Sequence, residues 1–272
     1  MVKFQKMNGA GNDFVMFDNR DGSLQLSAKE IARICDRHRG IGADGILLVE
    51  KAESTATPVD FRMRYYNSDG GEAEMCGNGA RCFARFAHQI SECAPMLKFQ
   101  TIAGLIEARI SGELVTLTMS APHDLRLNRD LRVGDEMGRI HSINTGVPHA
   151  VEFVDHLERI DVKTRGGQLR FHDAFQPRGT NVNFVKKLSD HVIVVRTYER
   201  GVEGETLACG TGVVASALLH ALVHGVSSPI AVEVRGGDTL EVGFQRNGEH
   251  FENVTLTGPA DFVFDGEIEI GD

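Results

Sequence analysis

Tryptophan is absent from this chain of 272 residues, and only three tyrosines occur. A surface on which nucleic-acid bases stack depends on such aromatic side chains. Basic residues are also in the minority, because 29 Lys and Arg stand against 38 Asp and Glu, which gives a net charge of −9. No cluster of Lys and Arg forms a basic stripe. The composition therefore argues against a nucleic-acid-binding protein.

Long hydrophobic segments are missing as well. The longest apolar stretch, 213–223, contains Ser216 and His220, and it is far shorter than the roughly 20 residues that a membrane-spanning helix needs. The first residues carry no apolar segment of the kind found in secretory signals. We therefore expect a cytosolic protein with no membrane partner.

Cysteine is scarce, and its number excludes a complete set of disulfides within one chain. There are five cysteines, and thiols in a cytosolic protein are normally reduced. The spacing of Cys76, Cys82, His88 and Cys93 matches no common zinc pattern. No Cys-x-x-Cys pair is present, which disfavours a redox dithiol. We expect no bound metal.

The chain does contain a repeated cysteine turn. Residues 74–80 read EMCGNGA and residues 207–213 read LACGTGV, at an offset of 133 residues (209 − 76). At the same offset, Tyr65 aligns with Tyr198 and Glu72 with Glu205. The sequence VTLT at 115–118 recurs at 254–257. The chain is therefore interpreted as a duplication whose halves meet near Pro122.

Each half has the same predicted order: strands, a cysteine turn, one apolar helix and further strands. A capping box at Ser27 to Glu30, with Gly40 further on, predicts a helix near 28–38. The other two strong helices are predicted at 78–89 and 211–224. Runs rich in β-branched and aromatic residues predict strands at 14–17, 46–49, 61–66, 114–119, 192–198, 231–234, 240–244 and 254–257. We expect an α+β fold of two pseudo-symmetric halves, each a curved, mostly antiparallel sheet around a central helix.

The cysteine turns have a chemistry that two thiols at one site would explain. A helix N-terminus lowers the pKa of a thiol, and its amides bind anions such as carboxylates. Gly77 and Gly210 allow a ligand to approach the backbone closely. If both N-termini face one pocket, Cys76 and Cys209 could remove a proton from one face of a carbon and return one to the other. A thiol hydrolase would need only one nucleophile.

Polar residues precede both turns, Asn67 in the first half and Glu199 with Arg200 in the second. Either group could be an ordinary solvated turn. Beside a thiol pair, however, these residue types match the groups of an amino acid, since arginine binds a carboxylate and glutamate accepts from an ammonium.

The chain resembles the diaminopimelate epimerase family, pyridoxal-independent amino-acid epimerases of bacterial lysine and cell-wall biosynthesis. The resemblance covers nearly the whole chain. Its motifs are MNGAGNDF at 7–14, RHRGIGADG at 37–45, NSDG at 67–70, CGNGARC at 76–82, GVPH at 146–149, NVNF at 181–184, YERG at 198–201 and ETLACGTG at 205–212. This number of motifs in the same order makes the resemblance specific.

The resemblance implies a role for each matching residue. Cys76 and Cys209 would be the acid–base pair, and His149 and Glu199 would tune the pKa values of the thiols. The reacting carboxylate would be held by Gly77, Asn78, Gly210 and Thr211. The rest of the substrate would be recognised by Asn12, Asn67, Asn181, Glu199 and Arg200. Of these, Asn67, Asn181 and Arg200 would contact the distal end. The family uses no cofactor, and its members are commonly homodimers. Its last strand returns to the first half, so the implied domains are 1–121 with 262–272, and 122–261.

The implied reaction is interconversion of L,L- and meso-diaminopimelate. Two positions depart from the pattern: Val147 stands where the family often has Asn, and Gly45 where some members have Gln. One alternative is a racemase of the same fold acting on proline, hydroxyproline or histidine, but such a substrate has no second carboxylate for Arg200. Another is a thiol redox or binding protein, which would not need the second cysteine turn.

Overall fold

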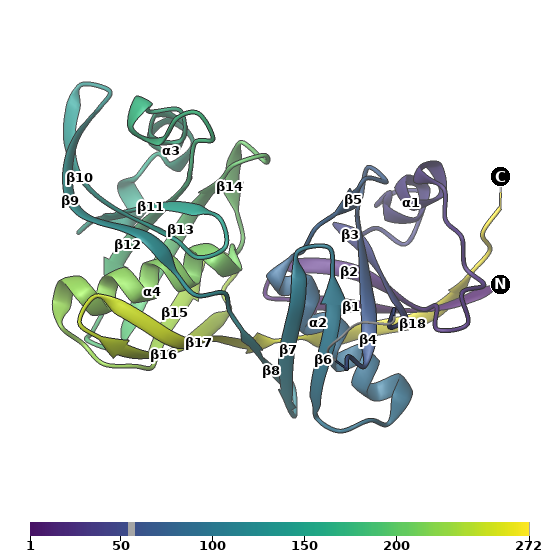
Figure 1. Cartoon of the computed structure of the whole chain (residues 1–272). Coiled ribbons are helices and arrows are strands. Elements are labelled where there is room, and N and C mark those ends of the chain that lie inside the picture. The colour runs from purple at the N-terminus through teal and green to yellow at the C-terminus, as the bar shows by residue number, and fades with distance from the viewer. Residues whose placement is uncertain (54–57, 272) are drawn as a thin grey trace. The chain divides into compact units, whose positions relative to one another are not determined.

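The computed structural model describes residues 1–53 and 58–271. Contacts divide the chain into two compact units, Met1–Leu117 together with the segment from Gly258 onward, and Thr118–Thr257 (Figure 1). No helix within the described ranges is both long enough and apolar enough to cross a bilayer.

The first unit is a mixed, mostly antiparallel sheet wrapped around helix α2 (Gly77–Ser91). Its pairing order is β18 (Asp261–Ile268), β1 (Val2–Gly9), β2 (Asn12–Asp18), β3 (Gly45–Lys51), β4 (Phe61–Asn67), β6 (Met96–Thr101), β7 (Gly104–Ser111) and β8 (Leu114–Thr118), with the short β5 (Glu72–Ala73) also on β4. Among the strands in the described part of this unit, only β2–β3 and β4–β6 are parallel pairs. Helix α2 contacts β1, β2, β3, β4 and β7, and is thus the centre of the unit.

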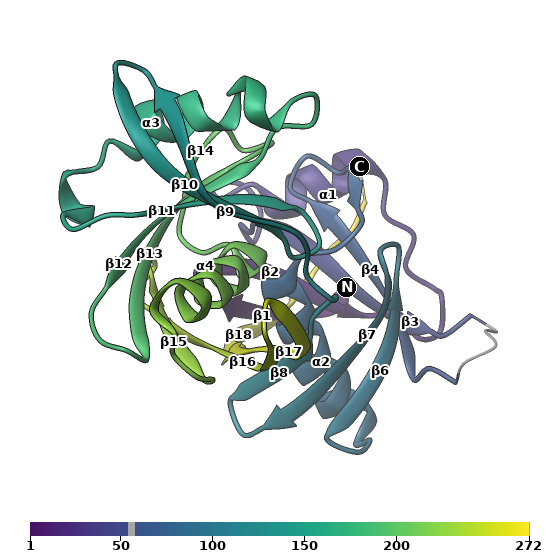
Figure 2. The same ribbon diagram turned by 60° about the vertical axis from the view of Figure 1, so that its left-hand side comes forward.

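The second unit repeats this topology around helix α4 (Gly210–His224), which the strands enclose in Figure 2. The order is β9 (His123–Val133), β10 (Glu136–Asn144), β11 (Pro148–Phe153), β12 (Asn181–Lys187), β13 (Val192–Glu199), β15 (Ile230–Val234), β16 (Thr239–Asn247) and β17 (His250–Pro259), with β14 (Gly204–Thr206) also on β13. The parallel pairs are β11–β12 and β13–β15, at the places that correspond to those in the first unit. The sequence repeat is therefore a repeat of topology, and the α+β class is confirmed.

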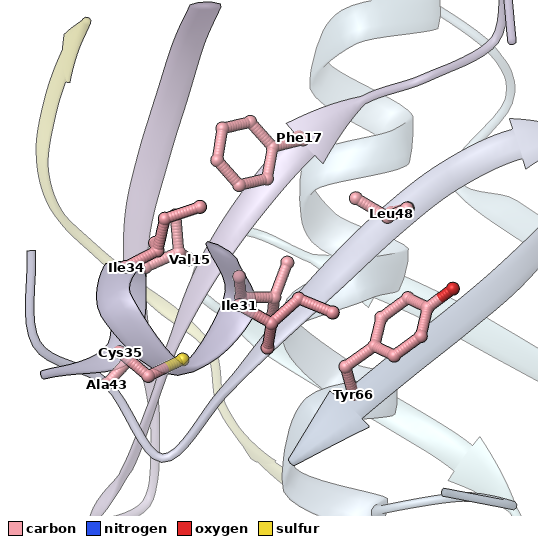
Figure 3. Close-up of a cluster of buried hydrophobic side chains, with 9 residues drawn as sticks. Val15, Phe17, Ile31, Ile34, Cys35, Ala43, Leu48 and Tyr66 are labelled. Atoms are coloured by element: carbon pink, nitrogen blue, oxygen red, sulfur yellow. The ribbon is translucent and has the colours of Figure 1, made fainter. Parts of the chain in front are cut away.

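The central strands β2 and β3 contain continuous apolar runs, at 14–17 and 46–49, because both faces of the strands are covered there. In β2, Val15 and Phe17 pack with α1 (Ala28–Cys35), as Figure 3 shows. The alternate residue Phe14 lies instead against Gly79 at the start of α2. Helix α1 begins with the predicted capping box, in which Ser27 accepts from the Glu30 amide and the Glu30 side chain accepts from the Ser27 amide.

The second unit has a helix that the sequence analysis did not predict. Helix α3 (Val162–Arg170) lies between β11 and β12 along the chain, as α1 lies between β2 and β3, and packs against β12 and β13. It contains Gly166 and Gly167, which disfavour a helix. Gly166 is required, because a Cβ there would lie 2.6 Å from Cβ of Tyr198. Close packing and helix propensity thus conflict in this segment. Two single-turn 3₁₀ segments, Leu157–Arg159 and Asp173–Phe175, flank α3.

Helix α1 ends earlier than predicted, at Cys35 rather than near residue 38. Gly40 is needed for another reason than ending the helix: a Cβ there would lie 2.0 Å from the Arg33 carbonyl oxygen. The chain after Gly40 folds back onto the last turn, where the Ile41 amide donates to the Ile34 carbonyl over 2.9 Å.

The alignment of Tyr65 with Tyr198 is wrong by one residue. The ladder pairs Tyr66 with Ile46, and Tyr198 with Val182 at the corresponding place in the second unit. Tyr198 is therefore the counterpart of Tyr66, at an offset of 132 (198 − 66). Two ion pairs agree: Arg64 binds Glu72 at 2.9 Å, and Arg196 binds Glu205 at 2.7 Å. The turn between these strands is one residue longer in the second unit, which restores the offset of 133 at the cysteines.

Candidate active site

Both cysteine turns place the thiol directly before a 15-residue helix. Cys76 caps α2 with φ −136° and ψ 122°, and Cys209 caps α4 with φ −122° and ψ 107°. The first intrahelical bonds return to these caps, from Ala80 N to Cys76 O at 2.7 Å and from Val213 N to Cys209 O at 2.9 Å. The amides ahead of those bonds have no intrahelical acceptor. Each thiol thus lies at the positive end of a helix dipole, which favours the thiolate.

The two thiols differ in their surroundings. Cys209 is 8 % exposed, whereas Cys76 is half-buried. The pKa of the Tyr65 phenol is raised, mainly by burial and next by the charge of the Cys76 thiolate. Tyr65 is therefore a neighbour of Cys76. The ring of Tyr65 also explains one departure from the family pattern. A Cβ at Gly45 would lie 2.7 Å from that ring and 2.4 Å from the Tyr66 carbonyl oxygen, so glycine is the residue that fits.

In the first unit, hydrogen bonds join two of the implied substrate residues. The side-chain amide of Asn78 donates to Asn12 Oδ1 over 2.7 Å, and the side-chain amide of Asn12 donates to Asp44 Oδ2 over 2.8 Å. Behind them, the buried Arg81 donates to Asn78 Oδ1 over 2.9 Å. Asn78 is itself 2 % exposed. The start of α2 is therefore held in place by a network that includes Asn12.

A charged cluster adjoins this network through Asp44. Arg37 donates to both carboxylate oxygens of Asp13 over 2.8 Å and to Asp44 over 2.8 Å. Lys6 lies 2.8 Å from Asp13. Burial raises the pKa of Asp13, but the hydrogen bonds from Arg37 and Lys6 outweigh it and lower this pKa to about 2. Asp13 thus stays ionised and fixes the strand that begins at Asn12.

Asn67 stands apart from these contacts. It is the last residue of β4 and is exposed. Its backbone N–H closes the turn by donating to the Gly71 carbonyl over 2.9 Å. Its position at the end of the strand is the one that Glu199 has in β13.

In the second unit, a hydroxyl connects the thiol with an imidazole. Thr211 Oγ1 lies 3.6 Å from Cys209 Sγ and 2.9 Å from Nε2 of His149. His149 is 1 % exposed. Burial, together with the positive charge of Arg200, lowers the pKa of this imidazole to about 3. His149 is therefore neutral at physiological pH.

Glu199 also contacts the Cys209 thiol. Its carboxylate accepts a hydrogen bond of 2.5 Å from Thr206 Oγ1 and one from the thiol of Cys209. Burial raises the pKa of Glu199, and the hydrogen bonds from Thr206 and Cys209 oppose that rise only in part. A carboxylate with a raised pKa is a suitable acceptor for a thiol proton.

Asn181 and Arg200 are joined through the backbone. The Arg200 amide donates to Asn181 Oδ1 over 2.8 Å, and the guanidinium donates to the Arg178 carbonyl over 3.2 Å. Val147, where the family often has Asn, has its carbonyl bound by the Thr145 amide over 3.2 Å. By strand register this position corresponds to Asn12 in the first unit.

The implied residues thus form two groups, one in each unit. Asn12 and Asn78 join the cap of α2 through hydrogen bonds, while Asn67 stays exposed. The sequence predicts no role for Thr206, which donates to Glu199, or for Asn183, whose side-chain nitrogen lies 3.1 Å from Nδ1 of His149. Asn183 had a signal, because NVNF places asparagines at alternate positions of a buried strand, so both face the same side. Among described residues, no set of three His, Cys, Asp or Glu is arranged to hold a metal ion.

Solved structures share this fold over the whole chain. A putative phenazine biosynthesis PhzC/PhzF protein from Clostridium difficile has a TM-score of 0.74 at 14 % identity, covering 99 % of this chain and 100 % of its own. A probable proline racemase from Agrobacterium radiobacter has a TM-score of 0.70 at 15 % identity, covering 100 % and 94 %. The chain therefore has the two-unit α+β fold of these proteins.

Sequence relatives define the family within that fold. The sequence model described as diaminopimelate epimerase matches residues 4–123 and 141–263. The diaminopimelate epimerase of Chlorobaculum tepidum is 42 % identical, covering 97 % of this chain and 100 % of its own. That of Aquifex aeolicus is 41 % identical, covering 98 % of both. This chain belongs to the diaminopimelate epimerase family.

Proposed function

We propose that this protein interconverts L,L- and meso-diaminopimelate without a cofactor. One observation carries the proposal. A cysteine caps the central helix at the same topological position in both units, in a chain whose whole-length relatives at 41 % and 42 % identity are diaminopimelate epimerases.

In this mechanism the reacting carboxylate binds the amides at the starts of α2 and α4, those of Gly77, Asn78, Gly210 and Thr211. Cys76 and Cys209 then lie on opposite faces of the α-carbon. One acts as a thiolate and removes the α-proton, while the other, as a thiol, delivers a proton to the opposite face. The amides stabilise the charge that develops on the carboxylate. A single base would mostly return the proton to the face it left.

Glu199 is the proposed proton acceptor for Cys209. Its carboxylate accepts a hydrogen bond from the thiol, and burial raises its pKa, which makes it a stronger proton acceptor. His149, whose pKa is about 3, takes part as a neutral hydrogen-bonding group rather than as a cation.

Arg200, with Asn67 and Asn181, is proposed to recognise the distal end of the substrate. The amides of the two helices already serve the reacting carboxylate, so the guanidinium is available to bind the second one. Lysine lacks that carboxylate and should be a poor substrate.

We further propose that the enzyme works in the cytosol as a homodimer. Its odd number of cysteines fits a reducing compartment, and the family resemblance supports the dimer, which light scattering would test.

The direct test is incubation with pure L,L-diaminopimelate in deuterated water without added pyridoxal phosphate, followed by chiral analysis. We expect meso product carrying deuterium at the inverted carbon. Proline, hydroxyproline and histidine should remain unchanged. If no meso product forms, the proposed reaction is wrong, and turnover of one of those three would favour the racemase alternative.

A further inference from the structure

The two units differ in the layer of side chains beneath the first turn of the central helix. Under α2 this layer is apolar: the nearest atoms to a Cβ at Gly79 belong to Leu47 and Phe14. At the matching position under α4, the nearest atoms to a Cβ at Gly212 belong to Asn183 and His149.

Strand register extends this comparison by one more pair. It places Tyr65 opposite Leu47 in the first unit and Thr197 opposite Asn183 in the second. The fold thus tolerates two apolar side chains and an aromatic ring at these positions. The buried polar layer of the second unit therefore has a purpose other than forming the fold.

The hydrogen bonds fix the orientation of the buried Asn183 amide. Its oxygen accepts from Thr197 Oγ1 over 3.0 Å, and its nitrogen donates to the Ala150 carbonyl over 3.1 Å. A carbonyl can only accept, so that end must be the NH₂ group. Its second hydrogen points to Nδ1 of His149, 3.1 Å away.

This orientation determines which nitrogen of His149 carries the hydrogen. Since Nδ1 accepts from Asn183, a neutral imidazole has its hydrogen on Nε2 and donates it to Thr211 Oγ1 over 2.9 Å. The Thr211 hydroxyl is then an acceptor toward His149, and its own hydrogen is left for Cys209 Sγ at 3.6 Å.

We propose that Asn183 is a positioning residue that holds His149 as the Nε2-protonated imidazole and so directs the Thr211 hydroxyl hydrogen onto Cys209. The thiolate of Cys209 then receives a hydrogen bond from the Thr211 hydroxyl. This inference rests on the proposed function only in taking Cys209 as a reacting thiol.

Two charged groups also act on this chain of hydrogen bonds. Glu199 accepts from the Cys209 thiol and competes for its proton. Burial lowers the pKa of His149, and the positive charge of Arg200 lowers it further, so the imidazole stays neutral. Neither group contacts Nδ1 of His149 in the hydrogen bonds described, so Asn183 alone among them selects the tautomer.

The tautomer can be measured on the wild-type protein. Nitrogen-15 NMR of histidine-labelled protein, assigned with a His149→Gln variant, distinguishes a protonated from an unprotonated ring nitrogen. We expect His149 to stay neutral at pH 6–8 with hydrogen on Nε2. In Asn183→Asp, whose carboxylate can only accept, the hydrogen should appear on Nδ1. A wild-type His149 that carries its hydrogen on Nδ1 overturns the proposal.

A second measurement tests the effect on the thiol. The pH dependence of iodoacetamide alkylation at Cys209, followed by peptide mass spectrometry, reports the pKa of this thiol. Weakening one hydrogen bond to the thiolate in Asn183→Leu should raise that pKa by about one unit and slow alkylation about tenfold below it. Asn19→Leu is the matched control, because Asn19 is 2 % exposed and its amide donates to Leu24 and Glu50 in the first unit.

We expect Asn19→Leu to lower stability and leave the alkylation profile of Cys209 unchanged. An unchanged profile in folded Asn183→Leu refutes the proposal, as does an equal change in the control. Neither readout requires substrate turnover. An absence of epimerase activity would therefore refute the proposed function while leaving this inference to be judged on its own.

Discussion

Thr206 offers the sharpest test of the role given to Glu199. Its hydroxyl donates a 2.5 Å hydrogen bond to the Glu199 carboxylate, and this bond lowers the pKa that burial raises. Thr206→Val keeps the shape of the side chain and removes the donor. The pKa of Glu199 should then rise further, because its ionised form has lost a partner.

The magnitude follows from the strength of such a bond. A hydrogen bond to a charged group contributes about 1.5–3 kcal/mol, and one pKa unit corresponds to about 1.4 kcal/mol. Thr206 is only half-buried, so water can partly replace the hydroxyl and the lower end applies. We expect the pKa to rise by about one unit, which makes the ionised fraction about tenfold smaller on the acid side.

The assay is kcat/KM for diaminopimelate against pH, which reports the ionisation of the unbound enzyme. Glu199 must be ionised to accept the Cys209 proton, so the acid limb should move to higher pH by about one unit in Thr206→Val. Thr206→Ser retains the hydroxyl and should keep the wild-type profile. A uniform loss of activity with an unmoved acid limb would show that Thr206 has only a structural role.

Three further predictions concern charged residues. Arg200→Met should lower kcat/KM for diaminopimelate by at least about tenfold and reduce the ratio of kcat/KM for diaminopimelate to that for lysine. An equal loss of kcat/KM on both compounds would contradict the proposed role of Arg200 at the distal carboxylate. Because the folded protein raises the pKa of Glu199, wild-type stability should fall as pH rises through that pKa, and chemical denaturation of Glu199→Gln should lack this loss. The pKa of Asp13, about 2 against an ordinary 3.8, should stabilise the fold by about 2 kcal/mol above pH 4; this stability should disappear as pH falls toward 2 in the wild type but not in Asp13→Asn.

The sequence predicts those helices and strands in which no residue is selected for a tertiary contact against its local helix or strand propensity. Helices α2 and α4 lie at 77–91 and 210–224, close to the predicted 78–89 and 211–224. Each begins at a glycine turn; α4 then has a nearly continuous small and apolar run, and α2 has buried apolar residues at helical spacing. Helix α3 was missed because Gly166 serves contact with Tyr198 at the expense of helix propensity. The long hairpin of β9 and β10 was also missed, since most residues of β9 are polar or charged and partly exposed.

Matching identical residue types aligns Tyr198 of the second half with the wrong tyrosine of the first half. Tyr65-Tyr66 offers two partners for Tyr198, and the offset taken from the cysteines selected the wrong one. Strand register, which follows from backbone pairing across the sheet, distinguishes them. The same register shows that Leu47 corresponds to Asn183, an equivalence that links residues of unlike type. Such non-local pairings also bring Thr206 to Glu199. Motif spacing alone does not contain them.

The central claim is that Cys76 and Cys209 act as two separate bases on one carbon. The most direct measurement is NMR of α-proton exchange in deuterated water for Cys76→Ala and Cys209→Ala, each supplied in turn with L,L- and meso-diaminopimelate. We predict that both variants lose epimerisation, and that each retains slow exchange with only one isomer, a different isomer for each variant. Epimerisation near the wild-type rate in either variant, or exchange of the same isomer in both, would contradict the two-base mechanism.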